Sequence, residues 1–190
     1  MDSTATVIPG RGTVLFAPVD TDPVNIDAFS LTDPKTYTGW TASHTSREDA
    51  FTLTKEGGEV NQVGSWEDEA LRISRSPVTL GFTVNKIEMS KDNFELAFGE
   101  NNQWDAATKS LKIEGFGSAF RAVMAILIDG TGARMGFHLP NTEIFIGEMP
   151  AVDVENFYRF TLQGNIRSSE KLKYRMRAYT ARPYAASPTV

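Results

Sequence analysis

Side chains that could carry enzymatic chemistry are few in this sequence of 190 residues. It has no cysteine, which excludes disulfides and thiolate chemistry and is typical of a chain made in a reducing compartment. Its two histidines, His44 and His138, lie beside strand-like segments without a second donor at helical spacing. Because a zinc site needs more donors than two isolated histidines supply, we interpret both as surface or packed residues. We predict no catalytic residues, no metal site and no cofactor.

Two short motifs are similar to functional loops, but turns explain them better. Residues 130–136 read GTGARMG after an apolar strand. A phosphate-binding loop would open a helix there, whereas this run opens an alternating, strand-like pattern. Ser168 and Lys171 have S-x-x-K spacing, but the companion motifs of that enzyme class are missing. We expect a hairpin turn at each place.

The charges are distributed unevenly along the chain. Residues 1–108 carry 17 acids and 8 bases, a net charge of −9, and residues 109–190 carry 7 acids and 11 bases, a net charge of +4. Opposite fields would orient subunits that pack head-to-tail, although two solvated faces explain the pattern equally well. The most acidic stretch, residues 47–69, lacks the spacing of a calcium loop.

A basic group near the C-terminus could contact nucleic acid: Arg167, Lys171, Lys173, Arg175, Arg177 and Arg182. The whole chain is acidic, with a net charge of −5, and no nucleic-acid-binding motif accompanies the group. We favour pairing of these bases with the acidic segment of a neighbouring subunit.

Most of the elements that position these residues are strands. Apolar and polar residues alternate at 51–54, 78–85, 135–139 and 158–167, as in half-buried strands. One helix is predicted over residues 89–99, with Ser90 as N-cap and Gly99 as the stop. We predict a mainly β fold, an antiparallel β-sandwich or partly closed barrel with one flanking α-helix.

The length suggests one domain with arms. Residues 1–12 are interpreted as an N-terminal arm, residues 13–182 as the β domain and residues 183–190 as a C-terminal tail. Residues 57–76 form a loop too long for a hairpin turn, and compact domains rarely keep such loops without a use. No apolar run could span a bilayer, and no secretory signal is visible at the N-terminus.

Three stretches, taken in order, resemble the tail tube (major tail) proteins of bacteriophages with long non-contractile tails. The first is a Gly-Trp pair at residues 39–40 that leads into a Thr/Ser-rich run. The second, residues 57–99, joins a glycine pair, a tryptophan, a Thr-rich strand and the capped helix. The third, residues 121–164, joins an apolar strand, an Asp-Gly turn, a Leu-Pro-Asn step and a Tyr-Arg-Phe strand. Their order and spacing are more specific than any single motif.

The resemblance implies a structural protein of the virion tail, not an enzyme, made in the cytoplasm of the host bacterium. Six copies would form a ring, and stacked rings would form a hollow tube that DNA crosses at ejection without specific binding. The partners would be further copies of the chain and other tail proteins, namely the tape measure, the terminator and the tail tip. No membrane is involved.

The resemblance also implies roles for three groups of residues. The stacking loop and the terminal arms would contact the next ring, with these loop residues as candidates: Glu59, Val60, Asn61, Gln62, Trp66, Glu67, Asp68 and Glu69. Four strands would line the lumen, and the lumen-facing candidates are Glu48, Asp49, Glu56, Thr79, Thr83 and Asn85. Because a basic strand does not suit an acidic lumen, Lys173, Arg175 and Arg177 are assigned to a subunit interface.

Two other functions remain open at this point. One is the tube protein of a related contractile injection or secretion system. The other is a carbohydrate-binding β-sandwich that uses Trp40, Trp66 and Trp104.

Overall fold

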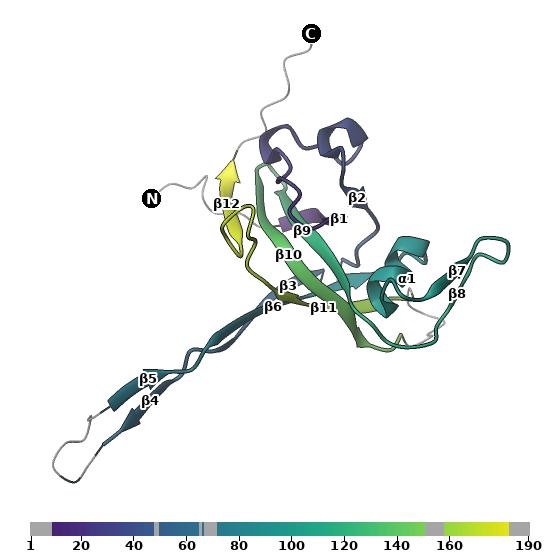
Figure 1. Ribbon diagram of the computed structural model, residues 1–190. Helices are drawn as coiled ribbons and strands as arrows, with labels where there is room; N and C mark the ends of the chain where they lie inside the picture. Colours follow the sequence, from purple (N-terminus) through teal and green to yellow (C-terminus); the bar gives the residue numbers. More distant parts are fainter. Residues whose placement is uncertain (1–8, 48–49, 65, 67–71, 151–157, 183–190) are drawn as a thin grey trace.

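The computed structural model describes residues 9–47, 50–64, 66, 72–150 and 158–182. Its main element is an antiparallel sheet with the strand order β2-β1-β9-β10-β11-β6-β3, and β12 also pairs with β10. These strands are β1 (Pro9–Ala17), β2 (Thr41–Ala42), β3 (Phe51–Gly57), β6 (Val78–Lys86), β9 (Ala119–Asp129), β10 (Arg134–Glu148), β11 (Phe160–Ile166) and β12 (Arg177–Arg182). Two small hairpins extend from the body (Figure 1): β4 (Val60–Val63) with β5 (Arg72–Arg75), and β7 (Gln103–Asp105) with β8 (Ser110–Lys112).

The helix α1 (Lys91–Phe98) forms where it was predicted. The Ser90 side chain accepts a hydrogen bond from the Asn93 N–H, and Gly99 ends the helix with a φ of 89°. Phe94 packs edge-on against Phe160 of β11, with ring centroids 5.2 Å apart. Two short 3-10 helices, η2 (Ile26–Ala28) and η3 (Pro34–Tyr37), lie between β1 and β2. In the described part of the chain, no helix is long and apolar enough to cross a membrane.

The sheet separates two apolar clusters. One lies between the sheet and α1 and includes Val14, Phe82, Phe98 and Leu162. The other lies on the opposite side of β1 and β9, where the chain between β1 and β2 supplies Phe29 and other covering residues. That chain does not extend over β3, β6 and β11, whose outer side chains are mostly exposed or half-buried. One part of the sheet therefore keeps an uncovered face.

The predicted fold class is confirmed, because the structure is mainly antiparallel β with one α-helix and the sheet does not close into a barrel. Three details differ from expectation. The strand β1 begins at Pro9, inside the segment interpreted as an arm. The strand β10 runs unbroken through Pro140, although the alternating pattern in the sequence ends at residue 139. A register shift against β9 between Leu139 and Thr142 accommodates the missing N–H of the proline. The long loop contains the β4–β5 hairpin.

Candidate assembly surfaces

The segment 57–76 contains β4 and β5, and its described residues, which we name the hairpin arm, project from the body of the molecule as a continuation of β3 and β6 (Figure 1). All the side chains of β4 and β5 are exposed. The apolar ones, Val60, Val63 and Ile73, are 55–61% exposed. A two-stranded hairpin without a core is marginal in water, and exposed apolar clusters mark interaction sites. The arm is therefore a candidate contact surface.

Two consecutive glycines form the joint between β3 and the arm. Gly57 and Gly58 have φ angles of 76° and 79°, which other residues rarely adopt. A Cβ atom at Gly57 would lie 2.0 Å from the Pro77 carbonyl oxygen. Beyond the joint, the Glu59 N–H donates to Ser76 Oγ and the Ser76 N–H donates to the Glu59 carbonyl oxygen, each at 3.0 Å. These constraints fix the direction in which the arm leaves the sheet.

The arm carries the described members of the predicted stacking group. Glu59, Val60, Asn61, Gln62 and Trp66 are all exposed on it. Glu67, Asp68 and Glu69 lie outside the described residues. The sequence interpretation emphasised acidity and missed the apolar Val63 and Ile73. It also missed the basic Arg72 and Arg75, which offset part of the acidic charge.

A second surface, which we name the polar face, covers the outer side of β3, β6, β11 and the C-terminal part of β10. The strand register aligns its residues in rows. One row is Thr52, Thr83, Gln163 and Phe145, and the next is Thr54, Gly81, Asn165 and Glu143. A hollow of about 170 Å³ lies over both rows. The alternate residues of the same strands point into the core, so this face remains free for a separate role.

The polar face includes four of the predicted lumen residues. Glu56 pairs with Thr79 across β3 and β6, and Thr83 lies in the adjoining row. Asn85 is buried and accepts a hydrogen bond from the Thr161 hydroxyl at 2.9 Å. Glu48 and Asp49 lie outside the described residues. Sequence reasoning missed the β10 and β11 members, because alternation indicates a side of a strand but not which strands lie next to it.

Hydroxyl and amide side chains dominate the polar face. Glu143 pairs with Arg167 at 2.5 Å and also accepts a hydrogen bond from Ser118 Oγ at 3.1 Å. The Arg167 guanidinium also lies over the Phe120 ring, 5.1 Å from its centre. Arg167 is therefore held by neighbours, and the face offers few free cations to a phosphate backbone.

The predicted interface residues Lys173, Arg175 and Arg177 are exposed on the chain that enters β12. The preceding turn is closed by Ser169, whose carbonyl accepts from the Lys173 N–H at 3.1 Å. The Tyr174 hydroxyl lies 2.8 Å from Nδ1 of His138. Burial lowers the pKa of His138 to about 4, so this histidine is neutral at physiological pH. In the described structure β12 pairs on one side only, and the bases border a free strand edge.

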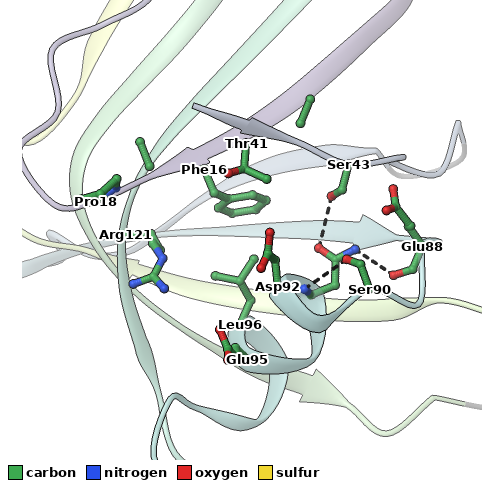
Figure 2. Close-up of a pocket in the computed structure, with 13 residues that line it drawn as sticks. Phe16, Pro18, Thr41, Ser43, Glu88, Ser90, Asp92, Glu95, Leu96 and Arg121 are labelled. Carbon is green, nitrogen blue, oxygen red and sulfur yellow. Dashed lines mark hydrogen bonds between the residues drawn. The ribbon is translucent and has the colours of Figure 1, made fainter. Parts of the chain in front are cut away.

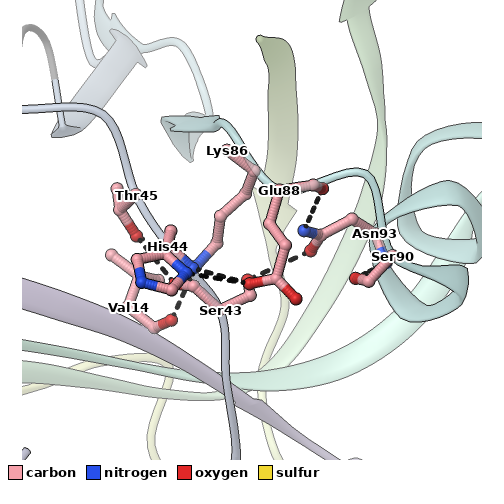
Figure 3. Close-up of polar contacts among 8 residues, drawn as sticks. All are labelled: Val14, Ser43, His44, Thr45, Lys86, Glu88, Ser90 and Asn93. Carbon is pink, nitrogen blue, oxygen red and sulfur yellow. Dashed lines mark hydrogen bonds and ion pairs between the residues drawn. The ribbon is translucent and has the colours of Figure 1, made fainter. Parts of the chain in front are cut away.

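A buried lysine joins two distant parts of the sheet. Figure 3 shows that Nζ of Lys86, at the end of β6, donates to the Val14 carbonyl at 2.8 Å. It also donates to the Ser43 carbonyl and to Oγ1 of Thr45, each at 3.0 Å. Burial lowers the pKa of Lys86 to about 7, and the charge of Glu88 opposes this shift. Because all three acceptors come from the chain itself, the lysine has a structural role.

A hollow of about 370 Å³ lies between α1 and β1 (Figure 2). Its charged lining residues are Glu88, Asp92, Glu95 and Arg121. Arg121 pairs with Glu100, and Glu88 lies 3.1 Å from Nδ1 of the exposed His44. Within the described ranges, no group of three or more histidine and carboxylate side chains could hold a metal ion. The hollow carries no recognisable catalytic set.

The remaining sequence candidates have structural places. Asp129 accepts hydrogen bonds from the Thr131 and Ala133 N–H groups, at 2.9 and 2.8 Å, so the glycine-rich run begins as the predicted turn. Trp40 is buried, and its indole N–H donates to the Asp22 carbonyl at 3.2 Å. Trp66 lies on the arm and Trp104 on β7, which extend from different sides of the body (Figure 1). The three tryptophans do not form one sugar-stacking surface.

Comparison with known proteins gives three findings. The sequence model of a family described as phage tail tube protein matches residues 1–176. No curated protein sequence matches the chain. Among solved structures, the chain is similar to a chain of the anti-feeding prophage baseplate, determined by cryo-EM with six-fold symmetry applied. The two are 13% identical, with a TM-score of 0.42, and the alignment covers 92% of this chain and 96% of that chain.

Proposed function

Because this chain belongs to the phage tail tube protein family, we propose that its copies close into six-membered rings that stack into a hollow tube, which DNA crosses at ejection. The resemblance to tail tube proteins is confirmed, and with it a structural, non-enzymatic role in the virion tail as part of an oligomeric tube. The ring size, the passage of DNA and the non-contractile type of tail belong to the proposal.

The hairpin arm is the observation that carries the proposal. It has no core of its own, exposes Val60, Val63 and Ile73, and leaves the sheet in a direction fixed by the glycine joint. An arm that binds a different surface of the next copy makes a heterologous contact, which repeats without limit along an open direction. We therefore assign the arm to contact between rings.

The polar face supports the assignment of a lumen. Its hydroxyl and amide groups tolerate water and give phosphates little to bind. The edge strand β3 is paired on one side only in the described structure. Pairing of this edge from Leu53 to Gly57 with a neighbouring subunit would extend the face around a ring and remove an aggregation-prone edge.

Electron microscopy of the purified protein over a range of concentrations tests the proposal. We expect rings or tubes from the wild-type chain. Deletion of residues 60–65 should leave the fold intact but abolish tubes, because the described side chains of this segment are exposed. Shortening the exposed β7–β8 turn is the control and should leave tubes unaffected. A wild-type chain that stays monomeric at every concentration would refute the proposal.

A further inference from the structure

The open side of the sheet forms a groove of about 440 Å³ between β1 and β3. Its apolar lining includes Val14, Phe51, Ala125 and Leu127, contributed by β1, β3 and β9. Arg11 and Arg47 lie exposed on the two rims. The groove lies where β1 and β3 would have to pair to close the sheet into a barrel. We name it the seam groove.

Both walls of the seam groove are incompletely paired strands. Along its length β1 pairs with β9, but with β2 only at Leu15 and Phe16. In the described structure β3 pairs with β6 alone. Unpaired backbone groups on strand edges are templates for another strand. A Cβ atom at Gly10 would meet only the Gly130 nitrogen and the Ile128 carbonyl oxygen, each at 3.9 Å.

Lys86 holds the two walls together without filling the space between them. Its ammonium reaches the Val14 carbonyl on one wall and the Thr45 hydroxyl next to the other (Figure 3). This one side chain therefore links the two walls, which backbone hydrogen bonds would join in a closed barrel. Beside this contact, residues 10–13 of β1 and Phe51 of β3 have no strand partner on the groove side in the described structure.

We infer that the seam groove receives the hairpin arm of a second copy of this chain. The arm of the same copy cannot occupy it, because Phe51, at the groove, and Gly57, at the arm, lie at opposite ends of β3. These ends are about 20 Å apart at the usual rise of a strand, and the arm continues away from the body (Figure 1). Only another subunit can place an arm there, and the contact then repeats head-to-tail.

The two surfaces complement each other in three respects. The arm exposes apolar side chains, including Ile73, and the groove has an apolar lining. Both strands of the arm have a free edge, because β4 and β5 pair only with each other in the described structure. By sequence, residues 57–76 carry four acids and two bases, whereas Arg11 and Arg47 lie on the groove rims. The inference rests on the proposed tube and names the surface that the arm binds.

Disulfide cross-linking tests this pairing directly, because the chain has no cysteine of its own. Ala50→Cys places a thiol in the groove, and Val60→Cys, Val63→Cys or Ile73→Cys places one on the arm. Each arm variant is combined with Ala50→Cys in one chain and oxidised under assembly conditions. We expect at least one combination to give a ladder of covalent oligomers on a non-reducing gel, which a reducing agent removes.

The matched control replaces Ala50→Cys with Ala106→Cys, the same substitution at an exposed position of the β7–β8 turn. Neither this combination nor the single variants should form a ladder. If microscopy finds tubes but no groove combination gives a ladder, or the Ala106 control gives an equal one, the inference is wrong while the proposed function stands. If no variant and no wild-type sample forms rings or tubes, the proposed function fails, and the inference fails with it.

Discussion

At the scale of single residues, Lys86 is the least expected feature. A buried ammonium is costly unless each of its protons is bonded, and here three acceptors satisfy it. The Phe16 ring adds a favourable contact, 5.0 Å from Nζ to the ring centre. The residue lies in the alternating run of β6, where sequence reasoning assigns no role to a single lysine. It links β6 to β1, two strands that are not paired with each other.

The lowered pKa of Lys86 predicts a specific dependence of stability on pH. In the unfolded chain the lysine keeps its proton up to about 10.5, whereas in the folded chain it loses it near 7. Between these values the unfolded state binds more protons, so the free energy of unfolding rises with pH, by up to about 1.4 kcal/mol per pH unit. Lys86→Met should remove this rise.

Urea denaturation of both proteins at pH 7.5 and pH 9.5 measures the difference. Lys112→Met, at an exposed position of β8, is the control and should keep the wild-type slope. Equal slopes for Lys86→Met and the wild type would contradict the pKa shift.

At the scale of elements, the arm depends on the joint at its base. The hairpin itself has little to hold it, since its side chains are exposed and its ladder has four pairs. The glycines and the bonds between Glu59 and Ser76 restrict its orientation before any partner binds. Restriction of this kind lowers the entropy cost of association.

Gly57→Ala should therefore impair assembly more than folding. The new Cβ atom would overlap the Pro77 carbonyl and would occupy a φ region that costs about 1–3 kcal/mol for a residue other than glycine. The arm must turn aside to relieve the overlap, and the concentration needed for tubes should rise by at least about tenfold. Sedimentation measures that concentration, and near-ultraviolet circular dichroism reports the core.

Gly130→Ala is the matched control, because its Cβ position is open and its backbone needs no positive φ. It should assemble at the wild-type concentration. Normal assembly of Gly57→Ala would mean that the joint does not orient the arm.

At the scale of the whole molecule, each side of the sheet has a distinct environment. The inner side packs against α1, the outer side of β1 and β9 lies under the chain between β1 and β2, and the outer side of β3, β6 and β11 is polar and open. A uniformly covered sheet would suit an isolated globule. An open polar face next to an exposed arm suits a subunit of a tube.

A positive charge on the polar face should make the proposed lumen bind DNA. Thr83→Arg adds one guanidinium per subunit in the middle of a row, without removing a core contact. Tubes of this variant should retain a short fluorescent oligonucleotide at low salt and release it as salt rises, because the binding is electrostatic. Wild-type tubes should retain little at any salt concentration.

Thr108→Arg, on the exposed β7–β8 turn, adds the same charge away from the face and serves as control. If both variants retain the oligonucleotide equally, the polar face does not line the lumen.

The sequence by itself determined the elements whose signals are local. Alternation indicated the strands, Ser90 and Gly99 delimited the helix, and the order of motifs identified the family, because these signals depend on neighbours in the chain. Only the tertiary structure decided that β3, β6, β11 and β10 lie side by side, that β4 and β5 pair into a hairpin arm, and that Lys86 reaches Val14. Those facts depend on register and on contacts between residues far apart in the sequence, and local sequence patterns do not indicate such contacts.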